Sequence, residues 1–357
     1  MKILFTGVYP HLYGGLERFA ERAAAALRQQ GHDVTVAGDP PVRAGGYDFV
    51  LMQKIPPTLD ALRRLKEACG DRLRFYAHDH ELYCLRRHYY TPCRRLCDRT
   101  YSFFPCRLCA AVTRPRWVFG NLFRPLPAIL REMRSVRTFT PSTYIRRRLL
   151  RDGFPDDGVK VLYPLFVRPF RDEAAGHRWM EGGRLRILFM GQLIAGKGVG
   201  ILLEAERLMS VPHTLTVVGT GRDEARLRRK APASVVFAGW QENAQRFFRD
   251  ADVCAVPSLW NEPVATVGLE AIAHGVPTAG FDVGGMGDWL LPGRTGFFAE
   301  TSDGRTRTAD ARTPAALAAA LDRFADPDRL RAMGEAALDL AGRLLDPDAF
   351  IRNLLQW

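Results

Sequence analysis

The fold is decided by residues 251–277, which read ADVCAVPSLWNEPVATVGLEAIAHGVP. The run up to Ser258 is apolar, as expected of a buried strand in a parallel sheet. Pro263 has a fixed φ that suits the first turn of a helix, so we expect a helix to open there. A buried strand followed at once by a helix is the unit from which α/β folds are built.

Two carboxylates, Glu262 and Glu270, are separated by seven intervening residues in this stretch. In a helix opened at Pro263 they are separated by about 12 Å, which suits the two ends of an elongated ligand better than one shared proton. The free N–H groups of the helix N-terminus can bind an anion between them. The pattern therefore predicts a nucleotide-sugar pocket, against the alternative of a helix cap at Glu262 and a solvated helix face at Glu270.

The same unit of strand, glycine turn and helix occurs twice in the chain, first from Ile3 to Gly31 and again from Leu185 to Met209. Such units predict two doubly wound parallel sheets whose ligands bind outside the carboxyl ends of the strands. With 357 residues the chain is long enough for both. We therefore predict four parts: an N-terminal Rossmann-like domain over residues 1–170, a linker at 171–183, a C-terminal Rossmann-like domain at 184–345, and a tail at 346–357 that packs back on the first domain.

Glu-x7-Glu, with the order of several glycine motifs around it, resembles the family 4 glycosyltransferases, retaining enzymes with two Rossmann-like domains that face a cleft, the GT-B fold. The resemblance extends over nearly the whole chain. The other motifs that carry it are Gly14-Gly15-Leu16-Glu17, Gly31-His32-Asp33-Val34, Gly191-Gln192-Leu193, Gly196-Lys197-Gly198, Val218-Gly219-Thr220-Gly221, His274-Gly275-Val276-Pro277, Gly284-Gly285 and Gly293-Arg294-Thr295-Gly296-Phe297.

The resemblance implies a role for each matching site residue. Glu270 would bind the ribose of the donor nucleotide, Glu262 the donor sugar, and Lys197 the diphosphate. His78, at the end of a probable strand, would reach towards the sugar, and Asp79 would orient it or cap the next turn. The implied catalytic residues are His78, Glu262 and Lys197, and the implied donor-binding residues are Gly14, Gly15, Gln192, Lys197, Glu262 and Glu270.

Two positions depart from the family pattern. Gln192 stands where most members have arginine, so one of two expected diphosphate cations is missing. Gly287-Asp288 replaces a common Pro-Glu, which leaves Asp288 without an assigned role.

In the family's mechanism the acceptor hydroxyl enters on the face from which the nucleoside diphosphate leaves, so no metal or other cofactor is required. Asp250-Ala251-Asp252 precedes a strand and is interpreted as its cap, since no Asp-x-Asp metal motif is evident.

The stretch from Cys84 to Asp152 has sixteen arginines and three carboxylates, within a chain of net charge +12. Residues 84–136 are interpreted as an insertion rich in cysteine and arginine. Because aromatic residues are interleaved with the arginines, an anionic membrane surface is one predicted partner. We expect Arg146, Arg147 and Arg148 to take part in docking. Arginine-rich codon usage explains the positive charge equally well. Nucleic acid is a third explanation of the charge, but we do not expect it as a partner.

Five of the seven cysteines lie in this insertion. The spacings of Cys93, Cys97, Cys106 and Cys109 are compatible with zinc or an iron–sulfur cluster, with Cys84 as the odd member. Reduced, partly buried thiols are the alternative.

No run approaches the roughly 20 apolar residues of a membrane span, and residues 1–7 lack the apolar core of a secretory signal. We therefore expect a cytoplasmic protein, peripheral on the inner face of the cell membrane. The predicted function is a retaining, metal-independent hexosyltransferase of polysaccharide biosynthesis, acting on a cell-envelope glycan or lipid-linked acceptor. A sugar-nucleotide epimerase or glycan phosphorylase on the same fold, and a non-catalytic basic binding protein, stay as alternatives.

Overall fold

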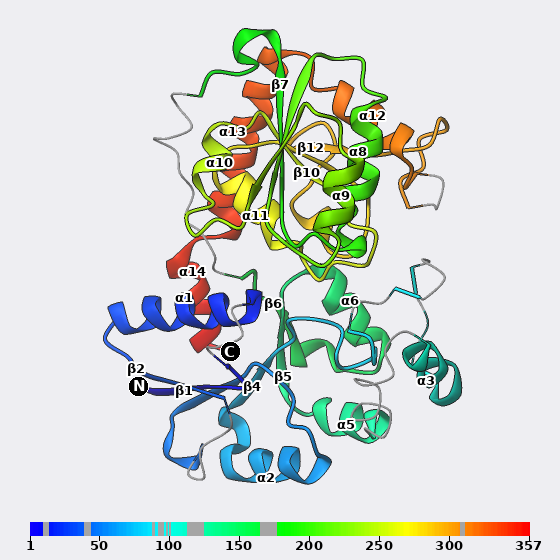
Figure 1. The fold of residues 1–357 in the computed structure, drawn as a ribbon. Helices are drawn as coiled ribbons and strands as arrows, with labels where there is room; N and C mark the ends of the chain where they lie inside the picture. Colours follow the sequence, from blue (N-terminus) through cyan, green and yellow to red (C-terminus); the bar gives the residue numbers. More distant parts are fainter. Residues whose placement is uncertain are drawn as a thin grey trace. The chain divides into compact units, whose positions relative to one another are not determined.

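The computed structural model describes residues 1–9, 14–38, 44–87, 90–91, 96–97, 99, 101–112, 125–164, 177–307 and 311–357. The chain divides into two compact units, shown in Figure 1. Unit 1 consists of Met1–Phe166 with Asp346–Trp357, and unit 2 of Val167–Leu345. Each unit has its own six-stranded sheet, and all the strand pairs that the structure describes are parallel. The predicted pair of parallel α/β sheets is confirmed.

The sheet of unit 1 has the order β2-β1-β3-β4-β5-β6. Its strands are β1 (Lys2–Thr6), β2 (Asp33–Ala37), β3 (Phe49–Met52), β4 (Leu73–Tyr76), β5 (Arg137–Thr140) and β6 (Val159–Val161). Its helices are α1 (Gly15–Gln29), α2 (Leu59–Cys69), α3 (Phe103–Ala111), α5 (Leu126–Met133), α6 (Thr143–Arg151) and α14 (Pro347–Leu355), with short 3₁₀ turns at Ala44–Gly46, Gly70–Arg72 and Asp156–Gly158.

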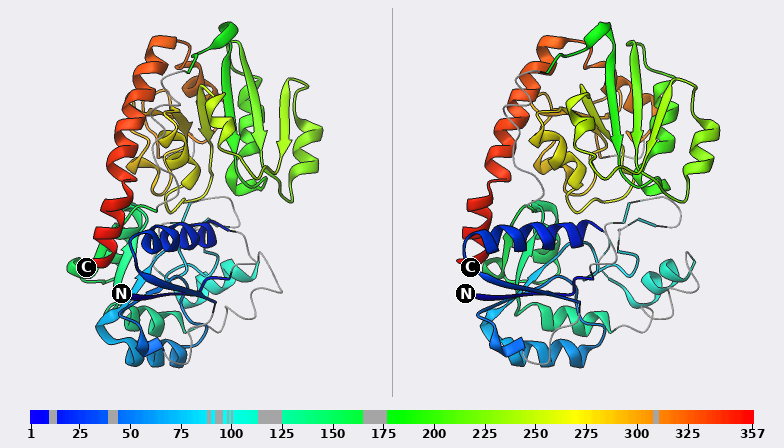
Figure 2. Two further views of the ribbon diagram at one scale, coloured as in Figure 1. Left: turned by 90° about the vertical axis from the view of Figure 1, so that its left-hand side faces the viewer. Right: turned by 60° about the vertical axis from the view of Figure 1, so that its left-hand side comes forward.

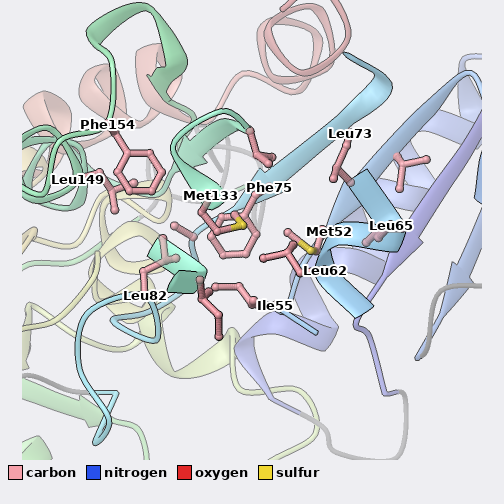
Figure 3. Close-up of a cluster of buried hydrophobic side chains, with 14 of the residues drawn as sticks. Met52, Ile55, Leu62, Leu65, Leu73, Phe75, Leu82, Met133, Leu149 and Phe154 are labelled. Atoms are coloured by element: carbon pink, nitrogen blue, oxygen red, sulfur yellow. The ribbon is translucent and has the colours of Figure 1, made fainter. Parts of the chain in front are cut away.

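Helices cover both faces of this sheet. Figures 1 and 2 show α1 and α14 on one face and α2 and α5 on the other. On the second face, apolar side chains from α2, α5 and α6 meet those of β3 and β4 in the cluster drawn in Figure 3. Phe75, at its centre, is fully buried. Strands β3 and β4 are buried along their whole length, as a sheet covered on both sides requires.

The last residues of the chain belong to unit 1. In α14, Phe350 makes an edge contact with Phe19 of α1, with ring centroids 5.9 Å apart. The indole of Trp357 lies against Phe139 of β5 at 4.8 Å, and the Trp357 carbonyl accepts a hydrogen bond from Arg74. Aromatic contacts of this kind bury large apolar areas, so they fix the tail on the sheet.

The sheet of unit 2 has the order β12-β11-β10-β7-β8-β9, the dinucleotide-binding order 3-2-1-4-5-6. Its strands are β7 (Leu185–Met190), β8 (His213–Val218), β9 (Val235–Gly239), β10 (Val253–Val256), β11 (Thr278–Gly280) and β12 (Gly296–Phe298). Its helices are α8 (Val199–Glu206), α9 (Glu224–Lys230), α10 (Arg246–Arg249), α11 (Thr266–Ala273), α12 (Pro314–Asp322) and α13 (Pro327–Leu344), with 3₁₀ turns at Glu181–Gly183, Ala195–Lys197 and Met286–Asp288. In Figure 1, α8, α9 and α12 cover one face and α10, α11 and α13 the other.

In this order the direction of winding reverses between β7 and β10, the two central strands. The carboxyl side of such a reversal is where open α/β sheets bind their ligands, because the loops after the two strands turn away from each other. The strand predicted within residues 251–258 is therefore confirmed as β10, and it lies at the switch point.

Asp252, interpreted from the sequence as a simple cap of β10, ties the two central strands together instead. It is fully buried. Its carboxylate accepts hydrogen bonds from the Arg186 backbone N–H at 2.8 Å, from the Arg186 guanidinium at 2.8 and 3.0 Å, and from the Met180 N–H at 3.0 Å. Burial alone would raise the pKa of Asp252, but hydrogen bonds from His177, Arg186 and Met180 lower it to about 2.

Among the helices within the described ranges, none combines the length and the apolar composition needed to cross a bilayer.

Candidate functional site

The site in unit 2 is built from the turns that follow β7 and β10. Lys197 ends the 3₁₀ turn after β7, between Gly196 and Gly198. The Leu259 N–H, from the turn after β10, donates to the Gly196 carbonyl at 2.8 Å and so joins the two turns. A Cβ on Gly196 would stand 2.3 Å from the Trp260 ring, so only glycine allows the indole to lie there.

Glu262 is the centre of the site. Its Oε1 accepts hydrogen bonds from the Lys197 ammonium at 2.7 Å, the Ser258 hydroxyl at 2.6 Å and the Trp260 indole N–H at 2.7 Å. The side chain of Glu262 is buried, and burial alone would raise its pKa. Lys197 and the two neutral donors outweigh burial and lower the pKa below its ordinary value, so Glu262 stays ionised.

The backbone around Glu262 does not follow the predicted helix. Pro263 does not open α11, which begins three residues later at Thr266, so that prediction is wrong. The reason is Ala265, whose φ of 53° is left-handed and cannot continue a helix turn. The estimated separation of about 12 Å between Glu262 and Glu270 assumed a continuous helix, so it does not apply.

Residues 262–265 instead form a loop that the Gly284-Gly285 turn holds in place. The Gly285 N–H donates to the Glu262 carbonyl at 2.8 Å. Gly284 has a φ of 61°, and a Cβ there would come within 2.0 Å of the same carbonyl oxygen. The buried Trp289 indole N–H donates to the Val264 carbonyl. The first glycine of the pair, Gly284, is therefore explained by its positive φ and its close approach to the Glu262 backbone.

Glu270 lies in the second turn of α11 and is buried. Its helix packs tightly, because a Cβ on Gly268 would meet the Trp289 ring at 2.2 Å. Cys254, on β10, has its pKa raised first by burial and then by the negative charge of Glu270. The second glutamate of the motif is thus placed by a rigid helix, whereas the first is placed by a loop.

Gln192 and Asp288 are the two positions of unit 2 at which the sequence departs from the family pattern. Gln192 follows β7 and is exposed. Asp288 lies in the 3₁₀ turn Met286–Asp288, two residues after Met286, and takes no part in the Glu262 cluster. Ser258 and Trp260, by contrast, were missed as partners of Glu262. Their hydroxyl and indole N–H, four and two residues before a glutamate in a turn, were the available signal.

In unit 1, Gly14 and Gly15 open helix α1, which is the helix of the strand, glycine turn and helix unit predicted from Ile3 to Gly31. The Gly14 N–H donates to the Glu17 carboxylate at 3.0 Å, and the Gly14 carbonyl accepts from the Arg18 N–H at 3.1 Å. This is a capped helix N-terminus at the carboxyl end of β1.

His78 follows β4 at the same edge of the sheet. Its Nε2 bonds the side-chain oxygen of Gln53, which follows β3. Burial first, then Arg87 and Lys54, lower the pKa of His78 to about 3, so the imidazole is neutral. Asp79 does not orient His78, because it pairs with Arg87 at 2.6 Å and accepts from the Glu81 N–H. Sequence reasoning missed Gln53, which no local pattern marks.

Four of the five cysteines of the insertion lie close together. Cys84, Cys97, Cys106 and Cys109 line one small cavity together with Tyr83 and Arg86. Within the described part of the chain, no three histidine, cysteine or acidic side chains are arranged to hold a metal ion. Cys93 lies outside the described residues. A four-cysteine metal site therefore stays a prediction, and elemental analysis of the purified protein, expected to show about one zinc or a visible cluster per chain, would test it.

The architecture and the position of the site define a class of protein. The two parallel six-stranded sheets with their flanking helices match those of GT-B glycosyltransferases. Over 100% of this chain and 99% of the other, the fold is similar to Anabaena HepE in complex with UDP, with a TM-score of 0.70 and 16% identity. It is also similar to sucrose-phosphate synthase from Thermosynechococcus elongatus, with a TM-score of 0.71 and 16% identity over 100% of this chain and 98% of the other. The predicted GT-B fold is confirmed.

The family match in the sequence lies in unit 2. Residues 184–325 match the family described as Glycosyl transferases group 1. The chain is 32% identical over 182 residues to a GDP-mannose-dependent alpha-mannosyltransferase of Mycobacterium tuberculosis, covering 49% of this chain and 47% of that protein. It is 40% identical over 191 residues to a D-inositol 3-phosphate glycosyltransferase of Streptomyces avermitilis, covering 52% and 36%. The match thus spans less than half the length of these two relatives, and it supports a glycosyltransferase.

Proposed function

We propose that this chain is a retaining, metal-independent hexosyltransferase of family 4, which moves a sugar from a nucleotide-sugar donor to a cell-envelope glycan or lipid-linked acceptor. The observation that carries the proposal is the Lys197–Glu262 pair at the switch point of unit 2, at 2.7 Å. A buried carboxylate kept ionised beside a lysine, at the edge where such sheets bind nucleotides, offers one group to sugar hydroxyls and one to phosphate.

Glu262 has one oxygen available for the donor sugar. Within the described residues, Lys197, Ser258 and Trp260 all donate to Oε1, and none donates to Oε2. We assign Oε2 to a hydroxyl of the transferred sugar. An ionised acceptor forms the stronger, charge-assisted hydrogen bond, and the three donors hold it in one orientation.

Lys197 and the N-terminus of α11 supply positive charge for the donor diphosphate. As the bond between the anomeric carbon and the β-phosphate oxygen breaks, negative charge grows on that oxygen, and fixed donors stabilise it. The acceptor hydroxyl attacks from the same face, and its proton passes to the departing phosphate. Gln192 is uncharged and exposed, so it adds no second cation. Lys197 therefore stabilises more of the diphosphate charge than the equivalent lysine does in a family member with arginine at the position of Gln192.

Glu270 binds the ribose hydroxyls of the donor, and its place on a packed helix makes this contact rigid. His78 is proposed to position the donor sugar as a neutral hydrogen-bonding group, because a pKa of about 3 keeps the imidazole uncharged near neutral pH and so leaves no imidazolium to act as a general acid. Gly14 and Gly15 offer the backbone of the α1 N-terminus to the same ligand.

The experiment is a thermal-shift screen with UDP and GDP sugars, followed by transfer assays with the donor that stabilises the protein. These bases are chosen because HepE is crystallised with UDP and a relative is GDP-mannose-dependent. We expect one nucleotide class to raise the melting temperature, and Lys197→Met to abolish the shift. Proton NMR of the product tests retention, and an inverted anomeric configuration would overturn the assigned mechanism. A product isomerised without transfer would instead indicate an epimerase.

We further propose that the protein is cytoplasmic and works at the inner face of the cell membrane, where a lipid-linked acceptor is found. The support is the arginine-rich stretch from Cys84 to Asp152.

A further inference from the structure

Helix α3 presents an apolar face to solvent. Phe104 is 80% exposed, Leu108 67% and Val112, its C-cap, 67%. These residues recur every fourth position, so they lie on one side of the helix. Half of the large apolar side chains that the structure describes as exposed lie within residues 103–112. Single exposed apolar residues are ordinary, but a contiguous exposed group marks an interaction surface.

The opposite side of α3 is already used for packing. Ala110 is buried in a small cluster with Leu85 and Leu126, and Cys106 packs against the same cluster. The helix is therefore apolar on both sides, whereas a helix at the surface of a soluble domain normally has a polar outer face. In Figure 1, α3 lies at the periphery of unit 1, away from the strands, so no part of the sheet needs this outer face.

The charge around α3 selects the partner. From Arg99 to Arg131 the sequence contains six arginines and no aspartate or glutamate. Two copies of such a surface would repel each other, which disfavours self-association. Nucleic acid would be bound through phosphates and aromatic stacking, and the aliphatic Leu108 and Val112 have no part in that. Exposed apolar side chains within a segment whose charged residues from Arg99 to Arg131 are all cations match the acyl boundary and the anionic headgroups of a bilayer.

We propose that the outer face of α3, formed by Phe103, Phe104, Leu108 and Val112, docks unit 1 on an anionic lipid surface. Arg107, whose guanidinium lies 3.6 Å from the centroid of the Phe103 ring, reaches the headgroups from the base of this face. The inference rests on the membrane association proposed above and names its contact surface, but it does not depend on the donor chemistry of unit 2.

The three arginines predicted to dock, Arg146, Arg147 and Arg148, differ in their surroundings. Arg148 is buried, and it donates to Asp152 at 3.1 Å and to the Arg99 carbonyl at 2.7 Å. Arg146 bonds the Val159 carbonyl and Asp156. The expectation is therefore wrong for Arg148, and a triple charge reversal would damage the fold of unit 1 rather than test docking.

The test is sedimentation of the full chain with phosphatidylcholine vesicles, with and without phosphatidylglycerol. We expect binding only to the anionic vesicles and a marked loss of binding at high salt, since screening weakens the arginine contribution. Phe104→Ser with Leu108→Ser should lower the partition coefficient by about tenfold or more, because two exposed apolar side chains lose their place in the interface. Deuterium uptake of residues 101–112 should fall when anionic vesicles are added to the wild type.

A matched control is Leu208→Ser with Val236→Ser, which removes two exposed apolar side chains from unit 2 and should leave partition unchanged. Both double variants replace surface residues, and circular dichroism will verify that they fold. Equal binding by the wild type and the α3 variant, or equal binding to neutral and anionic vesicles, would overturn the proposal. A wild-type dimer that the α3 variant dissociates would assign the face to a second copy. If the wild type docks on anionic vesicles but binds no nucleotide sugar, the transferase function is rejected and the docking proposal stands.

Discussion

Units 1 and 2 share the same parallel construction, yet the polar groups at the carboxyl edges of their sheets differ in kind. In unit 2 the edge holds a buried charge pair, Glu262 with Lys197, supported by two neutral donors. In unit 1 the corresponding edge holds the neutral pair His78 and Gln53, and the Gln53 side-chain nitrogen is buried with no hydrogen-bond partner among the described residues. The Glu262 carboxylate thus bonds a charged partner, whereas the His78 imidazole bonds a neutral amide, with the charged groups Arg87 and Lys54 acting on it without a hydrogen bond to its ring among the described contacts. Under the proposed function, the charged pair of unit 2 would bind the donor diphosphate, and the His78–Gln53 pair of unit 1 would bind neutral hydroxyls.

The largest expected effect tests how strongly unit 2 depends on buried charge. Asp252→Ala leaves Arg186 without its buried partner and should lower the free energy of unfolding by about 3–5 kcal/mol. Denaturant unfolding measures it. The control is Asp303→Ala, because Asp303 pairs with Arg305 in full solvent and should contribute nothing measurable.

The same residue predicts a pH dependence. Its folded pKa of about 2 lies below the unfolded value near 3.8. The stabilisation is therefore complete above about pH 4 and is lost as the pH falls towards 2. An Asp252→Ala protein as stable as the wild type at pH 7 would contradict the anchoring role.

The next effect concerns transfer. Lys197→Met should lower kcat by about 10²–10³-fold, because it removes the fixed cation that stabilises the leaving diphosphate. Glu262→Gln should also lower kcat, since the neutral amide loses the charge-assisted contact to the sugar. Because the two groups form one pair, the double variant should lose less than the product of the single losses. Strict multiplication of the two effects would show that they act independently.

A smaller effect separates the two glutamates. Glu270→Ala should weaken nucleotide binding by about 1.5–3 kcal/mol, whereas Glu262→Ala should mainly lower the rate of transfer. Calorimetry with the free nucleoside diphosphate gives the first quantity and steady-state kinetics the second. Unchanged affinity in Glu270→Ala would remove the ribose assignment.

The smallest effect lies in unit 1. The unfolded chain protonates His78 near pH 6.5, whereas the folded protein does so only at about pH 3. Stability should therefore fall as the pH drops from 6.5 to 3, and His78→Gln should remove part of that slope. Thermal unfolding between pH 5 and 7 measures it. Identical slopes in both proteins would show that His78 titrates normally and that its surroundings do not hold the imidazole neutral.

The sequence predicted most of the fold, because alternating strands, glycine turns and helices follow local rules. Strand β10 and helix α1 are examples, because a buried apolar run and a glycine at a helix end are both recognisable from neighbouring residues in the sequence. It failed at Pro263, where a proline favourable to a helix start is overruled by Ala265 and by the Gly284-Gly285 turn, more than twenty residues away. The role of Gln53 was equally hidden, because its contact with His78 joins two strands. Local patterns locate an element, whereas contacts between distant loops decide what its side chains meet.

The left-handed Ala265 has one further consequence. It separates a loop that carries Glu262 from a helix that carries Glu270, so a backbone change on one side of it need not be transmitted to the other. In terms of the proposed roles, preference for the transferred sugar and recognition of the nucleoside reside in independently adjustable segments. Insertions or substitutions within residues 263–265 would then alter which sugar is accepted while the nucleoside specificity persists. The specificity for the sugar and the specificity for the nucleoside of the donor can therefore change separately on this fold.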